Sequence, residues 1–469
     1  MDFVFNIFTN VGMGFSGIMN VECVLMISFG TFIGIVFGAL PGLTATTGVS
    51  IFLPLTFFMP PVPGIGFLLG IYCGGMYGGS ITAILINTPG APAAAATVLD
   101  GFPLTQQGRA LEALQMSLYA SCIGGFLSAF ILIVVSPLLA TVALGFGPSQ
   151  YFALGMFGMS IVAALSGGSI AKGLIAACFG LYLSFIGLDP INASLRLTFG
   201  TVELQNGVPL IPALIGLFAM SELYVQSEVV FKDVHKEKVI IRGKSLSWQD
   251  FRRCLRTIIK GSLIGTFIGA VPATGAAIAA FTSYNEAKRA SKSEAFGRGE
   301  LEGVAAPDSA HNGVTGGALI PLLTLGIPGD TVTAVLIGAL MIQGLTPGPL
   351  LFETAAHTVF ELYAALIMAN ICMLIMGIIG IRGCHRITDI PKHILQPILR
   401  TVLYRHLCHH DPFLRTILHV HNGLCRISFH QDTHPCGPRA TQPHSWSVGG
   451  VQSAPRAATD ARQFLGIHQ

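Results

Sequence analysis

The chain has 469 residues, of which 52% are hydrophobic and only 10% are charged, and its formal net charge is +3. Soluble domains have about 25% charged residues, so the composition excludes an ordinary soluble protein and indicates one whose solvent is the lipid bilayer. The small net charge, without basic residues interleaved with exposed aromatic ones, excludes a nucleic-acid-binding protein.

Two long stretches of the chain carry no Asp, Glu, Lys, Arg or His. One lies between Glu22 and Asp100, and the other lies between Glu112 and Lys172. Because one helix needs about 20 apolar residues to span a bilayer, each stretch contains several spanning helices. We therefore predict an all-α, polytopic transmembrane fold with roughly nine or ten spans. The expected spans lie near residues 23–40, 64–86, 115–138, 146–166, 172–188, 207–224, 258–282, 314–345 and 358–381.

A basic connection separates two apolar halves of the chain. Residues 228–260 contain nine Lys or Arg residues and four Asp or Glu residues. Loops rich in Lys and Arg stay on the cytoplasmic side of a membrane, so this segment is predicted to be a cytoplasmic loop. The first transmembrane half then covers residues 1–227, and the second covers residues 261–397.

The two halves resemble each other in sequence. Residues 30–41 match residues 261–272 in register, and each segment has three glycines four residues apart, followed by Ala-x-Pro. Further along, residues 78–90 and 316–329 each lead from a Gly-Gly pair to a Pro-Gly pair. We therefore predict two internal repeats, an arrangement in which transporters place the binding site at the repeat interface. Close helix packing is the role predicted for Gly30, Gly34, Gly38, Gly261, Gly265 and Gly269.

Four breaks interrupt the apolar runs, at residues 40–47, 87–90, 271–275 and 326–331. Irregular backbone at membrane depth is tolerated only where it is buried in protein or lines a wet cavity, so broken or re-entrant helices are expected there. Each break frees N–H groups at the start of a following half-helix, where the positive end of the dipole attracts a carboxylate or phosphate. Carbonyl groups freed at the preceding helix end suit Na⁺.

The breaks predict a binding site for an organic anion together with a coupling cation. Asp330 is predicted to hold that cation or a proton. The alternative is that the Pro-Gly pairs are kinks or helix ends at the membrane surface, but their paired positions in two halves favour a binding site. The predicted substrate-binding residues are Thr44, Thr46, Asn87, Thr88, Pro89, Gly90, Thr274, Gly275, Pro328, Gly329 and Thr331.

Two other polar segments have simpler interpretations. Residues 100–112 form a polar connection, for which a solvated loop is favoured over a gating contact. Asp308, His311 and Asn312 lie just before an apolar run. A lone histidine in this position is expected to be a helix-start residue rather than part of a proton relay.

Residues 398–469 differ in character from the rest of the chain. Nine of the fourteen histidines lie between His406 and His468, and no apolar run there is long enough to span a bilayer. The spacing of the His and Cys residues matches no regular ligand pattern, so no metal site is predicted. A reading-frame shift near residues 398–404 is the preferred interpretation, because shifted codons destroy hydrophobic runs.

Several long strings are typical of one protein family. They are GALPGLT at residues 38–44, YGGSITAILINTPG at 77–90, GAVPATGAAIAAFTSYNEAKRASK at 269–292, FGRGELEGVAAPDSAHN at 296–312 and GGALIPLLTLGIPGDTVTAVLIGALMIQGLTPGP at 316–349. Through these strings the chain resembles the large membrane subunit of bacterial tripartite tricarboxylate transporters. The resemblance extends from residue 15 to residue 397.

The resemblance implies a secondary transporter of the bacterial inner membrane that is driven by an ion gradient. It implies a carboxylate substrate and two partners, a small membrane subunit and a periplasmic solute-binding protein. No enzymatic activity and no cofactor are expected, apart from Na⁺ or H⁺ as the coupling ion. Consistently, the sequence contains no GxxxxGK[ST] nucleotide-binding motif. The resemblance also predicts further apolar spans after Pro397.

Several alternatives stay open at this point. Within the transporter class, the alternatives to a tricarboxylate carrier are a carrier of another organic anion and an inactive, truncated relative. A membrane-embedded enzyme acting on lipid-linked substrates needs catalytic acids or a Ser, His and Asp constellation at membrane depth, and residues 23–99 offer none. A channel or scaffold is the remaining alternative, for which the Pro-Gly breaks would be structural only.

Overall fold

The computed structural model describes residues 2–40, 43–165, 169–189, 194–200, 203–208, 217, 244–272, 274–291 and 295–381. The chain divides into a unit of residues Met1–Arg415 and a unit of residues Thr416–Gln469, and all of the described residues belong to the first. Several predictions fall outside the described residues. They concern Pro41, Gly42, Ala273, most of the span near 207–224, the first part of the loop at 228–260, and the tail at 398–469.

The described part of the chain is helical almost throughout, which confirms the predicted all-α fold. The first half contains α1 (Asp2–Ile18), α2 (Val21–Gly38), α3 (Ala45–Thr56), α4 (Pro61–Ile86), η1 (Pro92–Ala94), α5 (Ala95–Gln106), α6 (Ala110–Leu144), α7 (Pro148–Leu165), α8 (Ile170–Ser184) and η2 (Glu203–Asn206). Within the described ranges, the strands are β1 (Gly187–Leu188) and β2 (Leu195–Arg196), an antiparallel pair.

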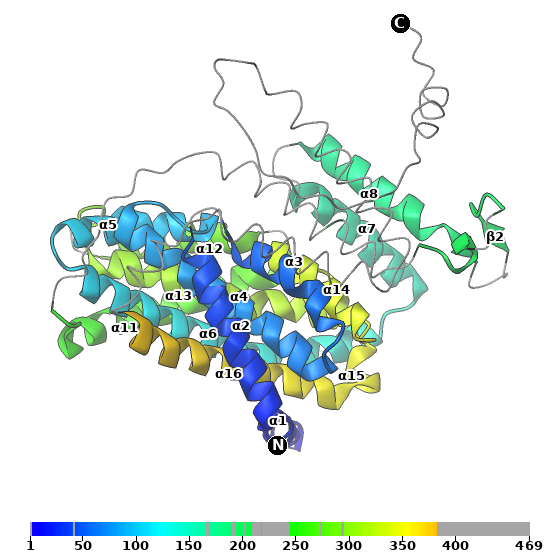
Figure 1. The fold of residues 1–469 in the computed structure, drawn as a ribbon, viewed down its shortest axis with the longest axis horizontal. Coiled ribbons are helices and arrows are strands. Elements are labelled where there is room, and N and C mark those ends of the chain that lie inside the picture. The colour runs from blue at the N-terminus through cyan, green and yellow to red at the C-terminus, as the bar shows by residue number, and fades with distance from the viewer. Residues whose placement is uncertain are drawn as a thin grey trace, which may run out of the picture. The chain divides into compact units, whose positions relative to one another are not determined.

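The second half contains a shorter series of helices, which Figure 1 shows in green to yellow. Residues 248–260 of the predicted basic loop belong to its first helix. The elements are α11 (Trp248–Ala270), α12 (Gly275–Ala290), α13 (Leu301–Leu325), α14 (Thr331–Ile342), α15 (Leu351–Thr354) and α16 (Ala356–Gly380).

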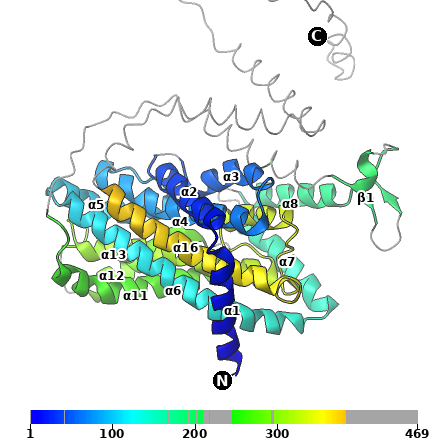
Figure 2. The same cartoon turned by 60° about the horizontal axis from the view of Figure 1, so that its bottom comes forward.

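Four of the described helices, α2, α4, α6 and α16, are long and apolar enough to span a bilayer by length and composition. The helix α16 packs against the other three (Figure 2). Two predicted spans are divided by the breaks within them. Residues 258–282 are split between α11 and α12 near Pro272, and residues 314–345 are split between α13 and α14 near Pro328.

The two glycine ladders allow pairs of long helices to touch backbone to backbone. The helix α2 packs on α4, and α11 packs on α13 (Figure 1). A Cβ atom on Gly30 would overlap the carbonyl oxygen of Phe67, and one on Gly265 would overlap the carbonyl oxygen of Ala310. These contacts confirm the packing role predicted for the ladders, since only glycine permits so close an approach.

The two Pro-Gly breaks have matching helix ends and matching backbone contacts. The helices that precede them end in the left-handed region, α4 at Asn87 with φ 55° and α13 at Gly326 with φ 72°, which is a common helix terminus. The following glycines lie against a ladder helix, so no side chain fits there. The matched contacts are Gly90 with Gly38 and Gly79, and Gly329 with Gly269 and Ala318.

Asp100 does not lie in a solvated loop, as the sequence had suggested. It sits in α5 with none of its surface exposed. One carboxylate oxygen accepts hydrogen bonds from the backbone N–H groups of Gly297, Gly299 and Glu300, and the other accepts from the hydroxyl of Tyr284 at 2.8 Å. The carboxylate therefore ties α5 to the segment that leads into α13.

The expectation that His311 begins a helix is also wrong. The helix α13 begins ten residues earlier, at Leu301, and Pro307 is accommodated inside it. Asp308, His311 and Asn312 thus lie near the middle of a helix that is buried along almost its whole length, each with 0% exposure. These polar residues concealed the helix in the sequence, since the hydroxyls that bond Asp308 come from Ser80 and Thr97 on other helices.

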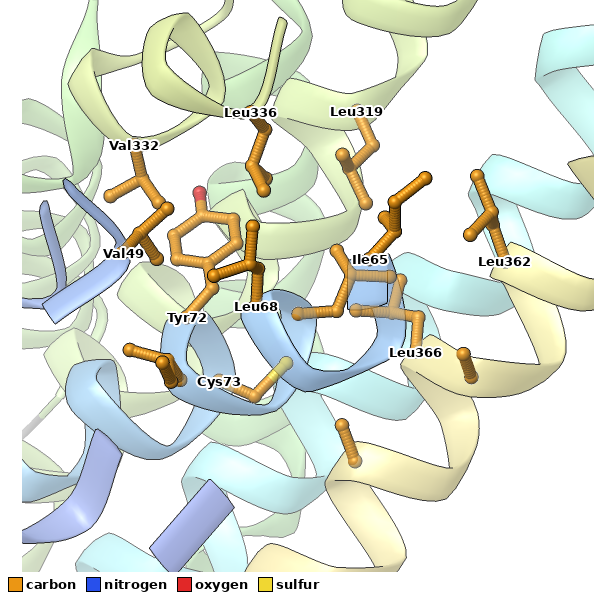
Figure 3. Close-up of a cluster of buried hydrophobic side chains, with 14 of the residues drawn as sticks. Val49, Ile65, Leu68, Tyr72, Cys73, Leu319, Val332, Leu336, Leu362 and Leu366 are labelled. Atoms are coloured by element: carbon orange, nitrogen blue, oxygen red, sulfur yellow. The ribbon is translucent and has the colours of Figure 1, made fainter. Parts of the chain in front are cut away.

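The apolar core near the start of α14 comes from both halves of the chain. Figure 3 shows Leu68 and Tyr72 of α4 directed toward Val332 and Leu336 of α14. Val49 of α3 lies beside Tyr72 and Val332 in the same view. All five side chains are buried, so the first turn of α14 is fixed against α3 and α4.

Candidate functional site

A cavity of about 330 Å³ lies where three helices, α3, α12 and α14, begin. The short helix η1, which follows the Pro-Gly pair of the first half, forms another part of its wall. The volume of the cavity is in the range of roughly 300–1,000 Å³ that is typical of small-molecule sites. The lining residues are Thr44, Ala45, Thr46, Met76, Ala91, Pro92, Ala93, Gly275, Ala276, Ala277, Asp330, Thr331 and Val332.

The start of α3 is shaped by a reciprocal cap. The hydroxyl of Thr44 accepts a hydrogen bond from the N–H of Thr47 at 3.2 Å, and the hydroxyl of Thr47 accepts one from the N–H of Thr44 at 3.3 Å. This capping box uses only part of the hydrogen-bonding capacity of the first turn. The N–H groups of Ala45 and Thr46 belong to that turn, and both residues line the cavity.

The start of α14 carries the same kind of cap with a carboxylate in place of a hydroxyl. Oδ1 of Asp330 accepts from the N–H of Thr333 at 2.8 Å, and the hydroxyl of Thr333 accepts from the N–H of Asp330 at 2.9 Å. The hydroxyl of Tyr72 donates to Oδ2 of Asp330 at 2.6 Å. Figure 3 shows this hydroxyl pointing toward the first turn of α14, beside Val332. Asp330 is 4% exposed and lines the cavity.

The start of α12 has no side-chain cap. Gly275 begins the helix with φ 72°, a conformation that favours glycine. The hydroxyl of Thr274 points back and donates to the carbonyl oxygens of Ile268, at 2.5 Å, and Val271, at 2.7 Å. Thr274 thus donates to carbonyl groups at the end of α11 and does not cap α12. The first turn of α12 lines the cavity.

The two halves of the chain meet through a pair of hydroxyl groups in this wall. Oγ1 of Thr46, in the first turn of α3, lies 3.1 Å from Oγ1 of Thr331, in the first turn of α14. Both residues line the cavity. Each hydroxyl has one hydrogen and two lone pairs, so the pair retains capacity for a further partner.

The electrostatics of the cavity favour an anion accompanied by a cation. The first turns of three helices line it, and the N-terminus of a helix carries the positive end of its dipole. Among the described residues that line it, Asp330 is the one with a charged side chain, and its carboxylate is already held by Tyr72 and Thr333. The N–H groups and hydroxyls offer donors for a carboxylate, while Asp330 offers a negative charge for a cation.

Five of the predicted site residues line this cavity, namely Thr44, Thr46, Gly275, Asp330 and Thr331. The others lie outside the lining. Asn87 is exposed at the end of α4, and the hydroxyl of Thr88 donates to the carbonyl oxygen of Ile86 at 3.2 Å. The remaining residues outside the lining are Pro89, Gly90, Thr274, Pro328 and Gly329.

Eight lining residues escaped the sequence-based prediction, and four of them, Ala45, Ala276, Ala277 and Val332, lie within two residues of predicted ones that line the cavity. Ala91, Pro92 and Ala93 follow directly after the Pro-Gly pair, and Met76 comes from the middle of α4. The position of residues 91–93 after a break was the signal available for them, because they form the start of the next helical segment. No signal in the sequence marks Met76, since an apolar residue in an apolar helix is normally core.

Broken helices whose first turns meet at one cavity, in a bundle with long apolar helices, define a polytopic helical membrane protein. The sequence profile described as the tripartite tricarboxylate transporter TctA family matches residues 24–405. The chain therefore belongs to this family, the large subunit of tripartite tricarboxylate transporters. The family assignment confirms the resemblance that the strings in the sequence indicated.

Two curated proteins of Agrobacterium vitis are similar to the chain. The first is named "Uncharacterized 52.8 kDa protein in TAR-I ttuC' 3'region" and is 35% identical over 397 residues, which cover 84% of this chain and 78% of that protein. The second is named "Uncharacterized protein in TAR-II ttuC' 3'region" and is 37% identical over 136 residues, which cover 29% of this chain and 56% of that protein. No solved structure gives a significant match.

Proposed function

We propose that the chain is the membrane subunit of a secondary active, binding-protein-dependent transporter that takes up tricarboxylates or related carboxylates with a coupling cation. Its membrane is the bacterial inner membrane, and its partners are a small membrane subunit and a periplasmic solute-binding protein. The observation that carries the proposal is the convergence of the first turns of α3, α12 and α14 on one cavity.

The cavity supports a carboxylate substrate because its donors are uncharged. N–H groups at helix starts and the hydroxyls of Thr44, Thr46 and Thr331 can bind carboxylate oxygens without a buried Lys or Arg. Uncharged donors hold an anion loosely enough to release it, as a carrier must. Alternating access would move the elements of one half against those of the other, and the contact between Thr46 and Thr331 lies at that boundary.

A coupling cation follows from the charge of the substrate. Moving one negative charge into a cell against the membrane potential costs about 2.3 kcal/mol per 100 mV, so an anion with several charges needs several cations. Asp330 is our proposed cation ligand, because its carboxylate lies in the wall of the cavity, within reach of the same bound substrate.

The competing functions differ in what they predict for transport. A carrier of another organic anion would have the same site. It would not take up citrate, but it would take up a different anion. A channel or scaffold would give uptake that neither saturates nor needs the binding protein. A membrane-embedded enzyme would convert its substrate, and the cavity lining holds no Ser, His and Asp constellation for that chemistry among its described residues.

The test is uptake of radiolabelled citrate and of related radiolabelled carboxylates by cells that lack their own carboxylate transporters. The chain is co-expressed with its small subunit and binding protein, and a second version carries a restored reading frame after Pro397. We expect saturable uptake that requires the binding protein. Uptake by the second version only would assign the loss to the residues after 397, and uptake of no carboxylate by either version would refute the proposal.

A further inference from the structure

A second polar cluster lies inside the helix bundle, outside the lining of the cavity described above. Its centre is Asp308 in α13, which is 0% exposed. The hydroxyl of Ser80, in α4, donates to Oδ1 of Asp308 at 2.9 Å, and the hydroxyl of Thr97, in α5, donates to the same oxygen at 2.5 Å. Three helices from both halves of the chain therefore meet at one carboxyl group.

Several polar atoms of this cluster have no hydrogen-bond partner. They include Oδ2 of Asp308, both ring nitrogens of His311 and Oδ1 of Asn312. All three residues are fully buried on α13. Buried polar atoms without partners are rare in proteins because each one loses its hydration, so a cluster of them points to an occupant or a transferable proton.

Asp308 has no Lys or Arg among its hydrogen-bond and ion-pair partners within the described residues. The nearest titratable group recorded is Nδ1 of His311, which lies 3.7 Å from Oδ1 of Asp308. A buried carboxylate that lacks a cation is costly, and it becomes neutral by taking up a proton. A proton on Oδ2 removes the charge and leaves the bonds from Ser80 and Thr97 in place.

The neighbouring helices also carry titratable groups. Three of the four basic residues of α11, Arg253, Arg256 and Lys260, line a separate pocket together with Glu286 and Glu302, and the fourth is Arg252. On α6, Glu112 is paired with Arg109. The buried titratable residues on helices packed against α13 are Tyr72, Cys73 and Tyr77 of α4, Asp100 of α5, Cys122 of α6, Cys254 of α11 and Tyr284 of α12.

Three of these residues are engaged in other hydrogen bonds, whereas Asp308 and His311 carry polar atoms without partners. The hydroxyl of Tyr284 donates to Asp100, and the hydroxyl of Tyr72 donates to Asp330. We propose that Asp308 and His311 form a proton-carrying pair inside the bundle. Asp308 takes up and releases the proton at Oδ2, and the neutral ring of His311, whose Nδ1 lies 3.7 Å from Oδ1 of Asp308, tunes the affinity of the carboxylate for that proton.

A proton fits the cluster better than a metal ion does. The packing there is tight, since a Cβ atom on Gly124 of α6 would overlap the carbonyl oxygen of Ser309, next to Asp308. A metal ion needs a shell of converging ligands, whereas a proton needs one acceptor atom. Within the described ranges, no group of three or more His, Cys, Asp or Glu residues is arranged to hold a metal ion.

The transport role of this pair rests on the proposed function, but protonation itself can be measured without transport. The experiment is infrared difference spectroscopy of the full chain in lipid vesicles, titrated with pH in the absence of substrate and partners. Wild type is compared with Asp308→Asn, Asp308→Glu and His311→Gln. Circular dichroism and size-exclusion chromatography verify that each variant is folded.

The expected result is a carbonyl band of a protonated carboxylic acid that disappears as the pH rises. The band is lost in Asp308→Asn, has a shifted frequency in Asp308→Glu, and titrates with a changed midpoint in His311→Gln, because coupled groups titrate as a pair. A band that survives in Asp308→Asn, an unshifted band in a folded Asp308→Glu variant, or an unchanged midpoint in His311→Gln would overturn the proposal. Loss of the band on adding Na⁺ at fixed pH would also overturn it, since a metal cation would then occupy the carboxylate.

Citrate uptake driven by an imposed pH gradient separates this inference from the proposed function. If the infrared result holds and no carboxylate is transported, the proton-carrying pair stands and the proposed function fails. If transport occurs, Asp308→Asn is expected to lose the stimulation of uptake by the pH gradient. Retained stimulation in that variant would contradict a coupling role for Asp308.

Discussion

The hydroxyl groups of Thr46 and Thr331 lie 3.1 Å apart, although 285 residues separate them in the chain. Thr46 is in the first turn of α3, and Thr331 is the first residue of α14. Their contact joins the two halves at the wall of the cavity. Both residues line the cavity, so the proposed carboxylate site includes a hydroxyl from each half.

Replacing either hydroxyl with a methyl group tests its part in substrate binding. A hydrogen bond to a charged group contributes about 1.5–3 kcal/mol, so Thr46→Val or Thr331→Val should raise the KM of citrate uptake by roughly 10- to 100-fold. The matched control is Thr141→Val, because Thr141 is exposed on α6 and its hydroxyl donates only to the carbonyl oxygen of Pro137. An equal KM in all four proteins would remove these hydroxyls from the site.

The charge of Asp330 can be separated from its role as a helix cap. Asp330→Asn removes the charge, whereas Thr333→Val removes the hydroxyl that bonds the N–H and Oδ1 of Asp330 and keeps both the charge and the bond from the N–H of residue 333 to Oδ1. We expect Asp330→Asn to lose the dependence of uptake on the coupling cation, with Thr333→Val retaining it at a lower protein stability. Uptake is measured across a series of Na⁺ concentrations and of imposed pH gradients. Similar cation dependence in the two variants would show that Asp330 only caps α14.

The glycine ladders predict a large effect of a very small change. Gly34→Ala and Gly265→Ala would place a methyl group into the backbone of α4 or α13, and overpacking of a close contact costs about 1–3 kcal/mol or more. We expect a lower thermal unfolding temperature or loss of the folded protein in detergent. Gly155→Ala in α7 is the control, because no atom lies within 4 Å of the added group. Equal stability of the three variants would contradict the packing described for the ladders.

Asp100 is expected to matter for stability rather than for transport chemistry. Its carboxylate accepts three backbone N–H groups and the hydroxyl of Tyr284, so Tyr284→Phe should lower the free energy of unfolding by about 1–3 kcal/mol. Asp100→Asn should cost more, since an amide has only one acceptor oxygen. Chemical denaturation in detergent measures both, and Tyr182→Phe at an exposed position is the control. No loss of stability in Asp100→Asn would show that the loop before α13 is held by other contacts.

The sequence predicted the parts of the fold that depend on local physics. Uncharged stretches required membrane helices, and the three-glycine pattern around Gly34 and Gly265 marked the close contacts, because close approach requires small residues wherever it occurs. The breaks near Gly275 and Asp330 were also visible, since a Pro followed closely by a Gly interrupts each apolar run. These local signals led directly to five of the residues that line the cavity.

The predictions that failed depended on partners far away in the chain. Asp308 and His311 were predicted to begin a helix. The hydroxyls that bond Asp308 belong to Ser80 and Thr97, more than 200 residues earlier, and nothing in the local sequence indicates them. Asp100 was taken for a loop residue for the same reason, as its partners begin at Tyr284. A polar residue in an apolar sequence indicates either a surface or a buried network, and only tertiary contacts decide between them.

The most direct test of the binding site is protection of a cavity residue by substrate. Ala276→Cys places a thiol in the first turn of α12, and its alkylation is followed by mass spectrometry of that position, with Thr141→Cys as the control outside the cavity. We predict that saturating citrate slows alkylation at residue 276 and leaves residue 141 unchanged. Equal rates at residue 276 with and without citrate, in a protein that transports citrate, would show that the substrate binds elsewhere.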